Sequence, residues 1–170
     1  IKGRITTAAL YQTLFLHRKH GILVFDDTDS IWKDQDAANI LKAALDSYDE
    51  RTISWYSGRT VNTSKMGPMQ KEEFNDEVDR MIEEDPANPK IKFPSEFPYE
   101  GQILFISNLT YDKFDSAVLN RAVKIDMTLT QEQLFKRMDS ILQHMGDKSV
   151  PMSAKKDIMD FLKDSFGRGE

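Results

Sequence analysis

The sequence predicts an α/β fold in which a parallel sheet is flanked by helices and followed by a small helical unit at the C-terminus. Two short apolar runs, Ile22–Phe25 and Ile103–Ile106, lie between segments with helical periodicity. Runs that are apolar at every position are typical of strands buried on both faces of a parallel sheet. Helices that alternate with such strands favour a sheet covered on both sides.

The N-terminal part predicts a helix, a strand and a second helix. Thr6 and Thr7 can cap the first helix, which Gly21 is expected to end, and its apolar residues are Ala8, Leu10, Leu14 and Phe15. The strand Ile22–Phe25 stops at two aspartates. The second helix is expected over Asp36–Asp46, because it carries a helical stripe made of Ala37, Ile40, Leu41, Ala44 and Leu45.

The middle of the chain is polar and rich in proline. A β-prone stretch, Thr52–Ser57, precedes residues 58–98, which hold five of the six prolines and an acidic segment. We interpret 58–98 as a surface insertion or mobile loop rather than a dedicated partner-binding element. One exposed helix is expected over Glu72–Glu84, where apolar residues recur at helical spacing, namely Phe74, Val78, Met81 and Ile82.

The C-terminal part predicts a short helix near Asp115–Asn120, a third strand over Val123–Met127 and two final helices. We place the core at residues 1–128 and a helical unit at 129–170. Thr130 and Gln133 form a capping box before a buried stripe of Leu134, Met138, Ile141, Leu142 and Met145. Ser153 is expected to cap the last helix, whose inward residues would be Ile158, Met159, Phe161, Leu162 and Phe166.

Composition excludes several classes of protein. The 170 residues carry a net charge of −5, so the chain has no broad electrostatic footprint for nucleic acid, although a local patch could still bind it. The absence of cysteine excludes disulfides, thiolate metal sites and a cysteine nucleophile. The apolar runs are too short to cross a bilayer. Because the chain begins at Ile1 and stops abruptly at Glu170, we expect a fragment of a longer protein.

Polar side chains follow both apolar strands. Asp26–Asp27–Thr28–Asp29 comes after the first strand and Ser107–Asn108 after the second. Ligands of open α/β sheets bind beyond the carboxyl ends of the strands. One carboxylate there can hold Mg²⁺ beside phosphates, and a second can orient or deprotonate water. We assign Asp26 to the metal and Asp27 to the water, and the alternative is a turn that merely ends the strand.

The order of these features resembles an AAA+ ATPase of the P-loop NTPase superfamily. Asp26 and Asp27 resemble its Walker B motif, and Asn108 resembles the polar tip of its sensor 1 strand, which contacts the γ-phosphate and positions water. The segment Asp115–Arg121 is similar to the part that delivers an arginine finger to a neighbouring subunit. Ile103–Arg121 also resembles bacteriophage ATPases. The alternative for Arg121 is a surface ion pair.

The resemblance implies a partial AAA+ core followed by a truncated helical lid. ATP and Mg²⁺ would be the cofactors and a homo-oligomeric ring the assembly, with hydrolysis coupled to remodelling of an unidentified macromolecule. Asp27, Asn108 and Arg121 would be catalytic, and Asp26 and Asn108 would bind the cofactors. A cytoplasmic location in a bacterium or a phage-infected host would follow.

The chain departs from this family in three ways. It contains no G-x-x-x-x-G-K-[ST] phosphate loop, so we expect the fragment alone to be inactive. Asp27 stands where most AAA+ enzymes have glutamate. The lid arginine called sensor 2 cannot be placed, since Arg168 lies past the last expected helix.

Two other functions fit part of the pattern. A haloacid-dehalogenase-like phosphatase would use Asp27 and Asp29 as nucleophile and acid and Ser107 as a second-strand hydroxyl, but Lys124 lies in a strand and no later acidic pair follows. A non-catalytic interaction module derived from an ATPase is the other alternative. Histidine catalysis is not expected, because His17, His20 and His144 lie on helix faces or ends.

Overall fold

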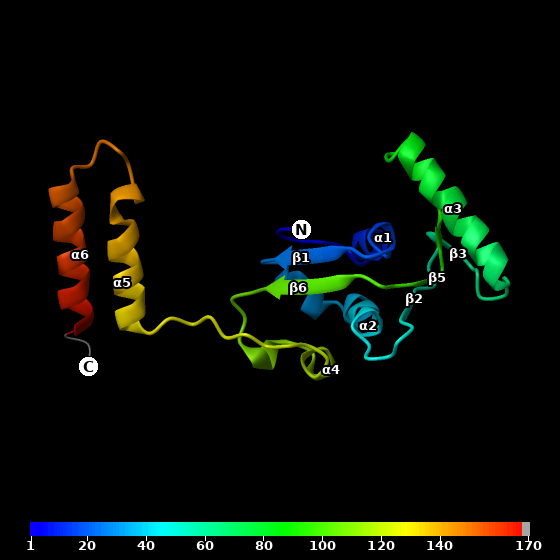
Figure 1. The fold of residues 1–170 in the computed structure, drawn as a ribbon, viewed down its shortest axis with the longest axis horizontal. Coiled ribbons are helices and arrows are strands. Elements are labelled where there is room, and N and C mark those ends of the chain that lie inside the picture. The colour runs from blue at the N-terminus through cyan, green and yellow to red at the C-terminus, as the bar shows by residue number, and fades with distance from the viewer. Residues whose placement is uncertain (168–170) are drawn as a thin grey trace. The chain divides into compact units, whose positions relative to one another are not determined.

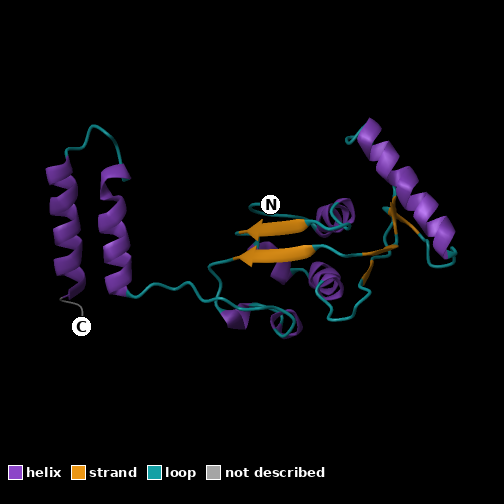
Figure 2. Cartoon of the chain, viewed as in Figure 1, coloured by secondary structure: helices purple, strands orange, loops and turns teal. Residues whose placement is uncertain are grey.

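The computed structural model describes residues 1–167 and divides the chain into two compact units, Ile1–Lys124 and Ile125–Glu170. Figure 1 shows the order of helices and strands along both units. The chain is a mixed α/β protein whose strands pair two by two (Figure 2). The division lies close to the predicted boundary between residues 128 and 129.

The first unit is organised around a two-stranded parallel sheet of β1 (Ile22–Asp26) and β6 (Gln102–Ile106). The register pairs Ile22 with Gln102 and Asp26 with Ile106, so both strands end at the same level. On the other side of β1, an isolated parallel bridge joins Lys2 to Asp26. The predicted parallel arrangement of the two apolar runs is therefore present.

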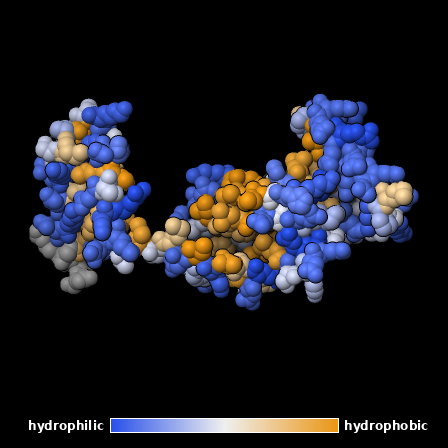
Figure 3. Space-filling model, viewed as in Figure 1, coloured by the Kyte–Doolittle hydropathy of each residue, from blue (hydrophilic) through white to orange (hydrophobic). Residues whose placement is uncertain are grey.

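The two faces of this sheet differ in burial. Leu23 and Phe25 are buried, and Ile103 and Phe105 pack against the same core. On the opposite face Ile22 is 69% exposed and Leu104 50% exposed, with Val24 and Ile106 also open. Figure 3 shows apolar side chains gathered at the surface of this unit. The prediction of strands buried on both faces is wrong for the described residues, because both flanking helices pack on one side.

Helices α1 (Thr7–Leu16) and α2 (Gln35–Ala44) cover the buried face and contact each other. Thr6 caps α1 as predicted, and Asp34 caps α2 by accepting from the backbone N–H groups of Asp36 and Ala37. The first helix ends at Leu16, before the predicted stop at Gly21. That glycine is instead needed because a Cβ would lie 2.9 Å from the His17 carbonyl oxygen.

Residues 58–98 are part of the first unit rather than a loose loop. Strands β2 (Thr52–Ser54) and β5 (Glu96–Pro98) pair antiparallel, and β3 (Thr60–Val61) and β4 (Phe93–Pro94) pair parallel. Helix α3 (Pro68–Glu84) contacts β4, and it starts four residues before the predicted helix. The loop prediction missed that the apolar residues in this segment reach the core.

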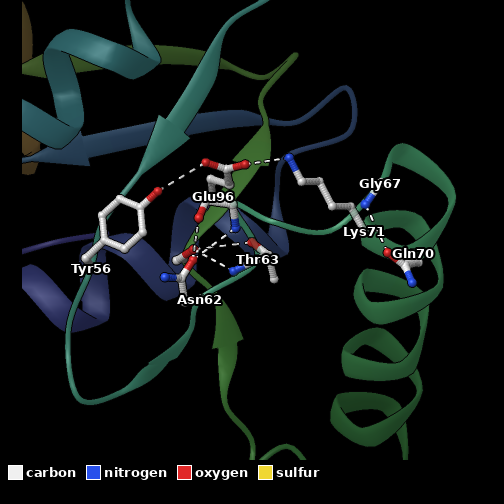
Figure 4. A network of polar contacts seen from close by, with 9 residues as sticks. Tyr56, Asn62, Thr63, Gly67, Gln70, Lys71 and Glu96 are labelled. Atoms are coloured by element: carbon white, nitrogen blue, oxygen red, sulfur yellow. Dashed lines mark hydrogen bonds and ion pairs between the residues drawn. The ribbon is translucent and has the colours of Figure 1, made fainter.

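Polar contacts fix this segment (Figure 4). Glu96 accepts from Lys71 of α3 at 2.6 Å and from the Tyr56 hydroxyl at 3.3 Å. The Ser95 hydroxyl accepts from the Thr63 backbone N–H at 3.0 Å, and both of these side chains are fully buried. Buried polar groups that are paired in this way hold a backbone in one arrangement.

One aromatic cluster forms the centre of the first unit. Phe15 makes edge contacts with Phe93 and Phe97, and Tyr11 makes one with Phe97. The Tyr11 hydroxyl donates to the Pro94 carbonyl at 2.9 Å, and burial raises the pKa of this phenol. Helix α1 therefore packs directly on the proline-rich segment.

Arg18, next to the end of α1, forms a partly buried ion pair with Asp79 of α3 and lies over the Phe15 ring. Its guanidinium also donates to the Phe15 carbonyl at 2.9 Å. Only 5% of the Arg18 side chain is exposed, against 34% for Asp79. The pair therefore fixes α3 to α1.

The end of the first unit lacks the third predicted strand. After the short helix α4 (Ser116–Leu119), residues 123–127 form no strand. Val123 is 93% exposed and Met127 82% exposed. An alternating pattern produces a strand only where a neighbouring strand offers backbone partners, and residues 1–167 supply none for this segment.

The second unit consists of α5 (Gln131–Ile141) and α6 (Met152–Gly167). The Thr130–Gln133 capping box is present. Helix α6 begins at Met152, and Pro151 supplies the first accepting carbonyl, so the predicted cap at Ser153 is wrong. Proline is tolerated at the start of a helix because the N–H group that it lacks would have no partner within the helix.

The predicted inward stripes of this unit are only partly buried. Met159 is buried, whereas Leu134, Ile158, Phe161 and Phe166 are exposed. Two helices can cover only one narrow stripe on each other, which leaves wider apolar faces open.

Short 3₁₀ turns connect these elements at Asp29–Lys33, Tyr111–Lys113 and Leu142–His144. Within residues 1–167, no helix combines the length and the apolar character that a membrane span requires.

Candidate functional site

The candidate site lies where β1 and β6 end side by side. Because Asp26 is paired with Ile106, the residues that follow each strand emerge at the same edge of the sheet. The Asp27 backbone N–H donates to the Ile106 carbonyl at 3.0 Å, which extends the ladder by one bond. Sheet pairing thus brings together two polar segments that are about 80 positions apart in the sequence.

Asp27 and Asn108 are in direct contact. The Asn108 side-chain amide donates to the Asp27 carboxylate at 3.1 Å. Asp27 has a φ of 53°, in the left-handed region that few residues other than glycine adopt. Unfavourable backbone conformations persist where the surroundings hold them, and they concentrate at functional sites. The turn therefore directs the Asp27 carboxylate towards the tip of the second strand.

Ser107 and Asp29 form a second bridge between the same two segments. The Ser107 hydroxyl donates to the Asp29 carboxylate at 2.7 Å and accepts from the Leu109 backbone N–H at 3.0 Å. The AAA+ interpretation gave Asp29 no role. The pattern that could have identified Asp29 is a carboxylate two residues after Asp27, together with a hydroxyl, that of Ser107, at the end of the second strand. The two bridges together fix the loops that carry Asp27 and Asn108.

Asp26 contacts the N-terminal residues instead of Asn108. Its carboxylate lies 3.1 Å from the Lys2 ammonium, and its backbone N–H donates to the Ile1 carbonyl at 2.8 Å. This ion pair, with a further contribution from the charge of Asp27, raises the pKa of Lys2. Along a strand, side chains alternate between faces, so Asp26 shares the open face with Val24. Sequence reasoning did not single out Lys2.

Arg121 lies against its own unit. Its guanidinium contacts Asp46 at 3.5 Å and donates to the Ala117 carbonyl at 3.0 Å. Asp115 caps α4 and pairs with Lys42 of α2 at 2.7 Å, which lowers the pKa of this carboxyl. Among residues 1–167, no hydrogen bond or ion pair joins Arg121 to Asp27 or Asn108. The finger candidate and the strand-end residues are therefore separate features.

The remaining candidates stay outside this cluster. Lys124 is exposed and lies at the last position of the first unit, and no strand contains it. His17, His20 and His144 are all exposed, and His20 pairs with Glu100 at 3.4 Å. Arg168 lies outside the described residues.

Oxygen ligands at the strand ends fit Mg²⁺ in chemistry but do not form a complete cage. Mg²⁺ is usually held by one or two carboxylates together with waters and substrate phosphates, and Asp26 and Asp27 can supply such carboxylates. Within the described chain, no group of three or more histidine, aspartate or glutamate side chains is arranged to hold a metal by itself. A metal here would therefore need water or phosphate oxygens as further ligands.

Comparisons with known proteins give one distant relative. No protein-family model matches the chain, and no solved structure matches it. The chain is similar to the "uncharacterized 36.7 kDa protein in nrdC-mobD intergenic region" of Enterobacteria phage T4, with 25% identity over 154 residues. The match covers 84% of this chain and 39% of the phage protein, so the chain spans about two fifths of its relative's length.

Proposed function

We propose that this chain is the C-terminal part of a bacteriophage-type AAA+ ATPase and contributes the residues that activate water for ATP hydrolysis. The observation that carries the proposal is the 3.1 Å hydrogen bond from Asn108 to Asp27, across the ends of two adjacent parallel strands. A carboxylate and a neutral amide at this edge match the needs of phosphoryl transfer to water. The phage T4 relative supports the phage-type part of the proposal.

Each residue has a separate task in this proposal. Asp27 accepts the proton of the attacking water, and Asn108 orients the carboxylate through its amide and leaves its carbonyl free for the same water. Asp26, which pairs with the Lys2 ammonium in this structure, would hold Mg²⁺, and the metal would supply charge neutralisation on the phosphates. Asp29 and Ser107 keep the two loops in register.

Arg121 would serve the site of a neighbouring subunit in a homo-oligomeric ring. A guanidinium remains charged and forks onto phosphate oxygens, so it can stabilise charge that develops on the transferred group. Its contact with Asp46 is a long, partly exposed ion pair at 3.5 Å, which a phosphate could replace. The hydrolysis would drive remodelling of a macromolecule.

The haloacid-dehalogenase alternative is less well supported. Ser107 contacts Asp29 rather than Asp27, the nucleophile that this alternative requires. The described residues also lack the further acidic cluster for Mg²⁺. The non-catalytic interaction module remains the competing proposal.

The first test is the sequence of the parent gene upstream of Ile1. A G-x-x-x-x-G-K-[ST] loop between a strand and a helix would supply the phosphate site that the proposal requires. A start codon directly before Ile1 would remove the basis for catalysis and favour the interaction module.

The second test uses the longer protein. We expect Asp27→Asn to keep ATP binding and to lower kcat about a hundredfold or more, as loss of a general base does. Asp36→Asn, an exposed aspartate in the first turn of α2, is the matched control and should leave turnover unchanged. Normal turnover in Asp27→Asn would remove this residue from the mechanism.

Arg121→Ala should suppress hydrolysis without dissociating the assembly. Arg137→Ala, an exposed arginine of α5, is its control. Mixing Arg121→Ala with Asp27→Asn subunits should restore part of the activity, because an Asp27→Asn subunit can supply its intact Arg121 to the intact Asp27 site of an Arg121→Ala neighbour. Absence of any recovery in mixed assemblies would contradict action between subunits.

A further inference from the structure

A second feature of the first unit is a cavity of about 520 Å³ that lies away from the candidate site. Its size is within the range of roughly 300–1,000 Å³ that ligand sites usually have. It is bordered by the C-terminal end of α1, the loop after β2 and the segment that joins α3 to β4. The end of α1 precedes β1, whereas Asp27 follows it, so the cavity is at the opposite end of this strand.

The floor of the cavity is apolar and partly open. Leu16, Ile82, Ile91 and Phe93 line it, and Leu16 is 48% exposed although it ends a helix whose other large apolar residues are buried. Exposed apolar side chains that gather in a concave site typically mark a binding surface. Pro86 and Pro89 form part of the wall, and their fixed φ angles reduce the entropy that ordering this wall would cost.

The charged side chains that line this cavity are cationic, whereas the carboxylates of Asp79 and Glu83 border an adjoining hollow that shares Leu16 and Ile82. Arg59 and Lys92 line the cavity, and no carboxylate lines it, although the chain carries a net charge of −5. Neither cation forms an ion pair with any residue from 1 to 167, whereas Arg18, Lys42, Lys71 and Arg121 of the same unit all do. The nearby Asp85 carboxylate is engaged with the backbone N–H of Ala87.

We propose that this cavity binds a short acidic segment of a partner protein, with aliphatic side chains on the apolar floor and carboxylates towards Arg59 and Lys92. Extended peptides place alternate side chains on opposite sides, so alternating aliphatic and acidic residues would meet both parts of the surface. Charge complementarity at the edge of an interface speeds association and selects against basic partners. The site acts independently of nucleotide, so it does not rest on the ATPase proposal.

Binding can be measured with the chain itself and a synthetic peptide that alternates leucine and glutamate. We expect saturable shifts in amide NMR spectra, centred on Leu16, Ile82 and Ile91. A peptide with glutamine in place of glutamate should bind about tenfold more weakly, equivalent to about 1.4 kcal/mol. A peptide with lysine in place of glutamate should show no saturable shifts.

The variant Arg59→Glu/Lys92→Glu should weaken binding of the acidic peptide by about tenfold or more. Lys33→Glu/Lys65→Glu is the matched control, because both lysines are exposed and neither lines the cavity. Thermal unfolding of both variants checks that the fold is kept. Equal weakening in the two variants, shifts centred elsewhere, or equal affinity for the glutamine peptide would overturn the proposal.

Discussion

The two units of this chain turn similar amphipathic patterns into very different degrees of burial. In the first unit, α1 and α2 bury most of their apolar residues, and Leu10, Leu14 and Leu41 are fully inaccessible. In the second, α5 and α6 carry comparable stripes, yet Met159 is the one buried apolar residue described between 125 and 166. Both units contain side-chain helix caps, formed by Thr6, Asp34 and Thr130.

The difference shows that local sequence sets which face of a helix is apolar, while the number of packed layers sets how much of that face is buried. In the first unit, helices, strands and aromatic side chains pack together in one core. The second has two helices that meet along one line, with Phe135 and Phe166 in edge contact.

The largest effect should come from removing an aromatic ring in the first core. Phe97→Ala should destabilise this unit by about 3–5 kcal/mol, because the ring is buried against Tyr11 and Phe15. Phe161→Ala in α6 should change stability by less than about 0.5 kcal/mol, since that ring is 69% exposed. Urea unfolding followed by far-UV circular dichroism measures both. Comparable losses in the two variants would contradict the contrast.

The ion pairs of the two units should also differ. Asp79→Asn leaves the buried Arg18 charge without its partner, and we expect a loss of about 2 kcal/mol, below the usual range because Asp79 is partly exposed. Asp139→Asn breaks the accessible pair with Lys163 and should cost less than about 1 kcal/mol.

The same unfolding measurement at two salt concentrations sharpens this test. High salt should reduce the effect of Asp139→Asn more than that of Asp79→Asn, because exposed pairs are screened more strongly. The opposite salt dependence would place the Arg18 pair in solvent.

The stability lost on removing a helix cap should depend on pH in the first unit, where the cap is Asp34, but not in the second, where it is Thr130. Asp34→Ala and Thr130→Ala should each cost about 1 kcal/mol near neutral pH. The Thr7 hydroxyl and the backbone N–H groups of α2 lower the pKa of Asp34. Asp34 therefore stabilises the folded state at pH values above its ordinary pKa of about 4. This stabilisation is lost as the pH falls through the lower pKa that Asp34 has in the folded state. Stability curves from pH 2 to 7 should converge for Asp34→Ala and the parent chain, and stay parallel for Thr130→Ala.

The smallest effect is expected on the open face of the sheet. Leu104→Thr should change stability by less than about 0.5 kcal/mol, because that side chain is half exposed and threonine suits a strand. Leu23→Thr on the covered face should cost about 2 kcal/mol or more, since it leaves a cavity and buries a hydroxyl. Similar losses at both positions would mean that the open face is covered in solution.

Only part of the candidate site could be predicted from the sequence. Asp27 and Asn108 were predicted to lie together because parallel strands end at one edge, and they are joined by a hydrogen bond. The Ser107–Asp29 bridge and the Lys2–Asp26 pair were not foreseen in this form. They depend on loop conformation and on the register of the N-terminal residues, which no local pattern records. The catalytic roles themselves remain predictions.

The sequence by itself determined the α/β class, the approximate positions of the helices, the caps at Thr6 and Thr130, and the two parallel strands, because periodicity and capping chemistry act over a few neighbouring residues. Tertiary structure decided the rest. It left one face of the sheet open, left residues 123–127 unpaired, and brought Val78, Phe93 and Phe97 of the proline-rich segment into the core. These outcomes depend on which distant surfaces meet, since burial and strand pairing need a partner that the local sequence does not specify.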